Sequence, residues 1–258
     1  MLIVANWKAY IEDFEKAKKL FAISKKLMRT IDCNIVLAPP APLLGALAFR
    51  NKSKIAFAAQ DVSATTGGAE TGEATVQAFA TVGATYAIIG HSERRAVGDT
   101  DAIVAKKLAH ALTQGLTPIL CIGESEHDDE GRYLAVVREE LTRAIEPLAP
   151  KERTEIIIAY EPLWAIGKNA SAAIKTNDLT EMVLYIRKIL AELLPGKSSA
   201  HSLVLYGGSV ESGNIRALAA TSGVDGFLVG HESVDPHAFT QLVKQLDQHQ
   251  IRFDAGRA

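Results

Sequence analysis

Side chains capable of proton transfer follow apolar, β-branched runs at three distant places in the sequence. Lys8 comes shortly after the run LIVA at residues 2–5, His91 directly after YAIIG at 86–90, and Glu161 directly after IIIAY at 156–160. A carboxylate, an imidazole and an ammonium serve in general acid–base catalysis and in stabilising a developing anion. The pattern therefore predicts a catalytic site if the fold brings these run ends together.

Glu161 has the sequence surroundings of a buried base. Pro162 restricts Glu161 to extended backbone conformations, and the apolar segment 163–166 stands where a surface loop would be polar. A carboxylate shielded from water has a raised pKa and suits proton abstraction. The alternative is an ordinary carboxylate on a surface loop.

His91 precedes Ser92 and Glu93, a combination that favours the start of a short helix. The positive end of a helix disfavours an imidazolium, so we expect a neutral ring. A structural histidine is the alternative. Lys8 alone could be a solvated lysine, and Asn6 alone is a weak signal.

Glycines gather at the last two apolar runs. Gly207, Gly208 and Ser209 end one run, and Gly230 closes the other. Exposed backbone N–H groups bind phosphate, and in (β/α)8 barrels the loops after strands seven and eight commonly hold it. We expect a phosphate site here, although a plain tight turn would also use glycines.

Eight short runs are apolar on both faces, as strands of a covered parallel sheet are. They lie at 2–5, 35–38, 55–59, 86–90, 118–122, 156–160, 203–207 and 226–230. Helical periodicity separates them, most clearly at 14–28 and 179–194. We expect Asn177 and Asp178 to cap the second of these helices, and Asp235 with Pro236 to begin the last one.

Strand–helix alternation repeated eight times predicts a single-domain (β/α)8 barrel over residues 1–258. An open doubly wound sheet is the alternative, but no Gly-x-Gly-x-x-Gly follows the first run. In a barrel the carboxyl ends of all strands share one rim. That rim would collect Asn6, Lys8, Gln60, His91 and Glu161.

The composition excludes some partners. A net charge of −2 argues against a general nucleic-acid or membrane-surface binder. The start MLIVANWKAY lacks the features of a signal peptide, and no apolar run approaches the roughly 18 residues of a membrane span. Cys33 and Cys121 have no metal-ligand spacing, so we expect reduced thiols and a cytoplasmic protein. Secretion by another route is the alternative.

Taken together, the motifs resemble the triosephosphate isomerase family along the whole chain. They are Asn6-Trp7-Lys8, Gly90-His91-Ser92-Glu93-Arg94-Arg95, Ala159-Tyr160-Glu161-Pro162, Trp164-Ala165-Ile166-Gly167 and Tyr206-Gly207-Gly208-Ser209-Val210. The resemblance implies a TIM-barrel enzyme of glycolysis and gluconeogenesis. Such an enzyme interconverts dihydroxyacetone phosphate and D-glyceraldehyde 3-phosphate through an enediolate and requires no metal or cofactor.

The resemblance also implies residue roles. Glu161 would move the proton, neutral His91 would donate to the enediolate oxygens, Lys8 would supply positive charge, Asn6 a further hydrogen bond, and Glu93 would orient the cluster. A lid over 162–170 would dry the site. The implied lid residues are Pro162, Trp164, Ile166, Lys168 and Asn169, and the implied phosphate-binding residues are Gly167, Gly208, Ser209, Gly230 and His231.

Three departures from the family pattern leave alternatives open. The family usually has Thr-Gly where this chain has Lys168-Asn169, and a second glycine where it has His231-Glu232; the loop after Arg95 is also one residue shorter than in the family pattern. Histidine and asparagine tolerate positive φ, which would preserve the backbone geometry. The rival functions are an isomerase of a four-carbon ketose phosphate and a barrel that binds a sugar phosphate without turnover.

The segment 60–73 resembles the loop by which family members form homodimers. Thr71 would lie near the partner's Lys8 and the partner's His91, and Gln60 would also belong to the interface. The alternative is a long surface loop on a monomer.

Overall fold

Parallel strands close into one barrel. The computed structural model describes residues 1–49, 51–153, 156–167 and 174–255, and within them each strand pairs with the next while β8 pairs with β1. The strands are β1 (Leu2–Asn6), β2 (Asn34–Ala38), β3 (Ala56–Ala59), β4 (Tyr86–Ile89), β5 (Thr117–Ile122), β6 (Ile157–Tyr160), β7 (Val204–Tyr206) and β8 (Gly226–Val229). The predicted single-domain (β/α)8 barrel is confirmed and the open sheet is wrong; that the domain extends over all of 1–258 stays a prediction.

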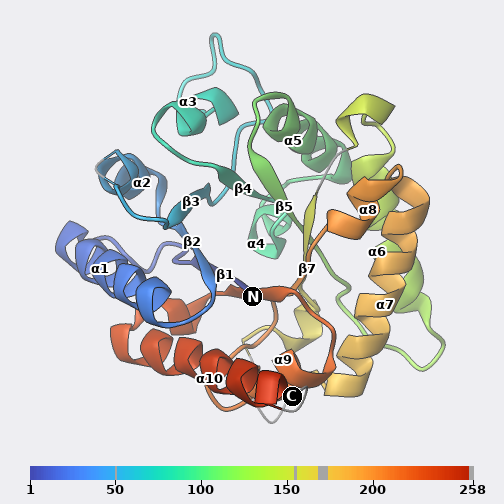
Figure 1. Cartoon of the computed structure of the whole chain (residues 1–258). Coiled ribbons are helices and arrows are strands. Elements are labelled where there is room, and N and C mark those ends of the chain that lie inside the picture. Colours follow the sequence, from blue (N-terminus) through green and yellow to red (C-terminus); the bar gives the residue numbers. More distant parts are fainter. Residues whose placement is uncertain (50, 154–155, 168–173, 256–258) are drawn as a thin grey trace.

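Helices surround the strands, as the view along the barrel in Figure 1 shows. The α-helices are α1 (Phe14–Thr30), α2 (Ala41–Ala48), α3 (Val76–Thr81), α4 (Ser92–Ala96), α5 (Asp101–Thr113), α6 (Arg132–Ile145), α7 (Thr176–Leu193), α8 (Lys197–His201), α9 (Ile215–Thr221) and α10 (Pro236–Ala255). Short 3-10 turns lie at η1 (Pro150–Glu152), η2 (Leu163–Ala165) and η4 (His231–Val234).

The core has two layers because successive strand side chains point to opposite faces. One set fills the barrel, among the described residues: Leu2, Val4, Val36, Ala38, Ala58, Ile88, Ile119, Cys121, Ile157, Ala159, Leu205 and Leu228. The other set, which includes Ile3, Ala5, Ile158 and Tyr160, packs against the helices. Both faces of each strand are therefore buried, as the continuous apolar runs predict.

Helix starts are only partly as expected. Asp235 accepts the backbone N–H groups of His237 and Ala238 at 2.9 and 2.7 Å, which confirms it as the cap of α10. The prediction that Asn177 and Asp178 cap α7 is wrong. The helix begins at Thr176, so both residues lie in its first turn, where the Asp178 carboxylate faces the positive helix end.

The two mouths of the barrel differ. The amino ends of the strands surround a cavity of about 650 Å³, lined by residues that include Met1, Asn34, Tyr86 and Thr117. The N-terminus lies near the middle of the strand ring in Figure 1. The carboxyl ends carry the polar residues singled out above. Within the described ranges, every helix is too short or too polar to cross a bilayer.

Candidate active site

A cavity of about 430 Å³ at the carboxyl ends of the strands collects the predicted catalytic and phosphate-binding residues. Its lining includes Asn6, Lys8, His91, Glu93, Glu161, Ile166, Gly167, Gly208, Ser209, Gly230 and His231. These residues come from the loops after β1, β4, β6, β7 and β8. The expected convergence of distant strand ends at one rim is therefore present.

Glu161 is a buried carboxylate, with a side chain only 3% exposed. Its Oε1 lies 3.3 Å from His91 Nε2, and its Oε2 accepts the backbone N–H of Ser92 at 3.3 Å. Burial raises the pKa of Glu161 above its ordinary value, against partial lowering by His91, the Ser92 N–H and Lys8. A raised pKa makes the carboxylate a stronger base than it is in water.

Gly207 makes room for this carboxylate. A Cβ at Gly207 would lie 2.8 Å from Glu161 Cγ, closer than side chains pack. The Gly207 N–H donates to the carbonyl of Tyr160 at 2.8 Å, so its own loop is fixed to β6. The first glycine of the Gly-Gly pair thus serves the base directly, and its N–H is not available to a phosphate.

His91 is held in one tautomer. It is the N-cap of α4, and its Nδ1 accepts the backbone N–H of Glu93 at 3.1 Å. A nitrogen that accepts this bond carries no proton, so the ring is neutral with its proton on Nε2. That proton points into the cavity beside Glu161.

Lys8 is fixed by contacts at both ends. It has φ +45°, the one positive φ outside glycine in the described chain, and its N–H donates to Asn6 Oδ1 at 3.0 Å. Its carbonyl accepts from Gln60 at 2.9 Å. Its Nζ lies 2.6 Å from Glu93 Oε1, so Glu93 is the counter-ion of Lys8. A strained backbone held in this way keeps the ammonium at the cavity.

The loops after β7 and β8 form the other end of the cavity. Ser209 donates from Oγ to the carbonyl of Ala165 at 2.8 Å, which joins the loop after β7 to the segment after Glu161. His231 begins the 3-10 turn η4, and its ring lies edge-on to Tyr10 at 5.8 Å. The expectation of positive φ at His231 is wrong, since the 3-10 turn needs negative φ.

A model of the triosephosphate isomerase family matches residues 1–246. The chain is 36% identical over 247 residues to a triosephosphate isomerase of Thermus thermophilus, covering 95% of this chain and 98% of the relative. It is 38% identical over 247 residues to the enzyme of that name from Moorella thermoacetica (94% and 97% covered) and 37% over 255 residues to that of Streptomyces coelicolor (96% and 98%). The chain belongs to the triosephosphate isomerase family.

Family membership makes the chain an aldose–ketose isomerase. Glu232 is one of the chain's departures from the triosephosphate isomerase pattern. Glu232 lines the cavity next to His231, and burial together with Glu211 raises its pKa. Lys168 and Asn169, the other departure, lie outside the described residues.

The expected lid of this triosephosphate isomerase family member differs in its first turn. Ile166 and Gly167 line the cavity, but Leu163 is 41% exposed and Trp164 turns toward Glu124. The physical reason is the indole N–H, which donates to Glu124 Oε1 at 2.7 Å. Pro162 precedes this turn as its N-cap. Only part of the apolar segment thus faces the cavity in this structure.

Glu124 is a buried residue that the sequence reasoning missed. It is 1% exposed, and its Oε1 also accepts the Tyr160 hydroxyl at 2.8 Å, while its carbonyl accepts the Leu163 N–H at 2.9 Å. The signal was present, because Glu124 follows β5 as closely as other polar residues follow their strands. Glu124 anchors the segment after Glu161.

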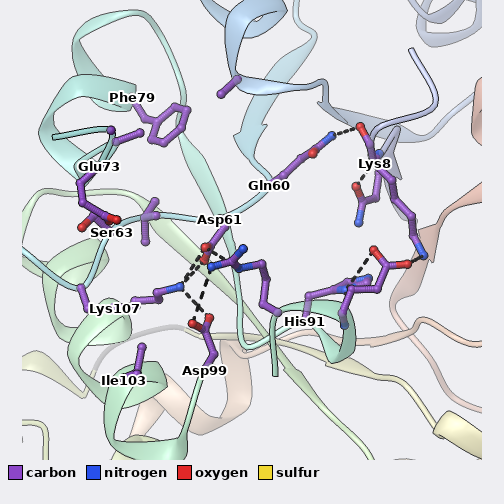
Figure 2. Close-up of a pocket in the computed structure, with 18 residues that line it drawn as sticks. Lys8, Gln60, Asp61, Ser63, Glu73, Phe79, His91, Asp99, Ile103 and Lys107 are labelled. Atoms are coloured by element: carbon purple, nitrogen blue, oxygen red, sulfur yellow. Dashed lines mark hydrogen bonds and ion pairs between the residues drawn. The ribbon is translucent and has the colours of Figure 1, made fainter. Parts of the chain in front are cut away.

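A second cavity of about 540 Å³ adjoins the site and shares Asn6, Lys8, His91 and Glu93 with it (Figure 2). Its lining holds an ion-pair cluster in which the Lys107 ammonium is buried. Lys107 Nζ lies 2.7 Å from Asp61 and 2.6 Å from Asp99, and Arg94 Nε lies 2.9 Å from Asp61. Because Arg94 belongs to α4, the cluster ties the helix that His91 caps to α5 and to the loop after β3.

Proposed function

We propose that this chain interconverts dihydroxyacetone phosphate and D-glyceraldehyde 3-phosphate, with Glu161 as the base. One observation carries the assignment of roles. In a member of this family, a buried carboxylate faces a neutral imidazole at 3.3 Å in the cavity that also contains Lys8. A base, a proton donor and a cation then act on the same small substrate.

Glu161 removes a proton from the carbon next to the substrate carbonyl and returns it to the neighbouring carbon. His91 donates from Nε2 to the oxygens of the enediolate, where negative charge develops. Its fixed tautomer supports this role, because Nδ1 is already occupied by the Glu93 N–H. The substrate hydroxyl gives up, and the carbonyl oxygen gains, one proton through His91, so the carbonyl of one isomer becomes the hydroxyl of the other with no net gain or loss of protons or electrons.

Lys8 supplies positive charge to the phosphate and to the enediolate, and Asn6 adds a hydrogen bond. The Lys8–Glu93 pair supports a positioning role for Glu93. Since Asn6 accepts the Lys8 N–H through Oδ1, its NH2 group remains for the substrate. Gly167, Gly208, Ser209, Gly230 and His231 bind the phosphate in this proposal, supported by their place along one side of the cavity.

The segment 162–170 acts as a lid that excludes water while the enediolate exists. Ile166 and Gly167 at the cavity, and the Ser209–Ala165 hydrogen bond, support this role. Pro162 and Trp164 belong to this lid as well. Lys168 and Asn169 belong to the predicted lid by their place in the sequence and lie outside the described residues.

The chain acts as a homodimer in this proposal. Residues 66–74 are exposed, Thr71 among them, and they leave the barrel beside the second cavity. That cavity opens toward Lys8 and His91, so the same loop of a second copy seated in it would bring the partner's Thr71 to the site. Gln60 lines the cavity while holding the Lys8 carbonyl.

We also propose a cytoplasmic location. Cys121 is a buried thiol outside any disulfide, which suits a reducing compartment. Fractionation of the source cells with an antibody against the chain tests this, and recovery in a secreted fraction would contradict it.

A coupled assay with D-glyceraldehyde 3-phosphate tests the function. We expect turnover that Glu161→Gln reduces by a factor of at least about 10², since that change removes the base. A tetrulose phosphate assayed in parallel is expected to react more slowly. The absence of triose phosphate turnover, or faster turnover of the tetrulose phosphate, would contradict the proposal.

A further inference from the structure

A histidine that the proposed mechanism does not use lies against the turn after the base. His127 follows β5, and its ring stacks on Tyr133 of α6 with centroids 3.9 Å apart and an interplanar angle of 25°. The same ring lies 5.4 Å from the ring of Trp164 in η2. His127 therefore links α6 to the start of the proposed lid.

His127 also lies beside the anchor of Trp164. Its Nδ1 is 3.7 Å from Glu124 Oε1, the oxygen that accepts the indole N–H and the Tyr160 hydroxyl. Both hydrogen-bond donors are neutral, and Glu124 Oε2 has no protein partner among the described residues. Among the described side chains, His127 alone lies within 4.0 Å of the Glu124 carboxylate and can carry a positive charge. The Glu124 carboxylate is thus buried without a permanent counter-ion.

We infer that His127 is a positioning residue for Trp164, and that protonation of its imidazole strengthens the hold of this cluster on the turn after Glu161. An imidazolium attracts the Glu124 carboxylate, and it makes a cation–π contact with a tryptophan ring that lies within about 6 Å. A neutral ring offers stacking alone. Movement of Trp164 away from Glu124 is then less favourable at acidic pH. The effect on turnover rests on the proposed lid role of this segment.

Both carboxylates and a guanidinium lie near His127. Glu124 faces it from the loop after β5, Glu126 and Asp128 are next to it in the chain, and Asp128 is ion-paired with Arg132 at 2.9 Å. From α6 comes Tyr133, whose pKa is raised by burial and by nearby carboxylates, so that its hydroxyl stays neutral. Asp178 and Glu181 of α7 add negative charge near Tyr133. Trp164 has no charge.

Tryptophan emission tests the inference without relying on activity. The chain has two tryptophans, and the other, Trp7, is fully buried and common to all variants. We expect emission to change between about pH 5 and 8, the range of histidine titration, in the unmodified chain. His127→Phe keeps a stacking ring without a charge and should lose this change. His237→Phe, at an exposed position of α10, should keep it.

Kinetics provides a second readout. The kcat of His127→Phe relative to the unmodified chain should rise about two- to fivefold as pH falls through the same range, as expected for a loss of one cation–π contact. His127→Gln should behave likewise and serves if the phenylalanine variant does not fold. An unchanged emission step in His127→Phe, or a kcat ratio independent of pH, would overturn the inference. Absence of isomerase activity would instead overturn the proposed function, while the emission titration would still be readable.

Discussion

Single side chains at the rim owe their chemistry to their surroundings. Glu161 is a carboxylate with little access to water, and its raised pKa follows from that burial. The imidazole of His91, the backbone N–H of Ser92 and the ammonium of Lys8 each lower the pKa of Glu161 in part and so favour its charged form. Burial that favours a strong base also disfavours the charged carboxylate in the folded state, so activity and stability oppose each other at this residue.

Glu161→Gln should therefore raise thermal stability while it removes turnover. Because the folded-state pKa is above the unfolded one, the folded protein binds more protons, and the carboxylate destabilises the fold as pH rises through that interval. We expect the Tm of the variant to match that of the unmodified chain near pH 4 and to exceed it at pH 8. Calorimetry across pH checks this. A lower Tm at pH 8 would count against a destabilising carboxylate.

Gly207→Ala should displace the base. The added Cβ would meet Glu161 Cγ at 2.8 Å, and the carboxylate must move to relieve the contact. A shift of about 1 Å costs up to about 10² in turnover. We expect kcat to fall by about 10- to 100-fold with a small change in KM. Gly213→Ala, where the new Cβ meets no atom within 4 Å, is the control and should leave kcat unchanged.

Ion pairs from α5 and from the loop after β3 hold α4 in place. The ion-pair cluster of Lys107, Asp61, Asp99 and Arg94 joins α5, the loop after β3 and the helix that His91 caps. Lys107→Met should lower the free energy of unfolding by about 3 kcal/mol, because two carboxylates lose a buried cation. Urea denaturation measures this. Lys106→Met, one position away and exposed, should change it by less than about 0.5 kcal/mol.

At the scale of elements the sequence predicts well where a local pattern is sufficient. Each strand agrees with its apolar run to within a residue at either end, because burial on both faces leaves a continuous signal. The predictions of the α7 cap and of the backbone conformation at His231 are wrong, because each depends on the residue at which a turn ends. The Lys107 cluster and Glu124 were not predicted. Their partners lie far away in the chain, and only closure of the barrel brings them together.

The whole molecule is expected to be stabilised by association. If two copies bury the exposed loop 66–74 in each other's second cavity, Tm should rise with protein concentration. Sedimentation should show a species twice the 27.7-kDa chain. Thr71→Arg should abolish both effects, whereas Gln241→Arg on the far helix α10 should abolish neither. A Tm independent of concentration, with a 27.7-kDa species alone, would rule out the dimer.

The separation of the two barrel mouths has a practical consequence. Met1 lies among the amino ends of the strands, across the full depth of the barrel from Glu161. A support or a fused reporter attached through the first residue would leave the substrate entrance open to the solution. Immobilisation from that end should leave sugar phosphates free to diffuse into the active site. Attachment near the opposite rim would obstruct that diffusion.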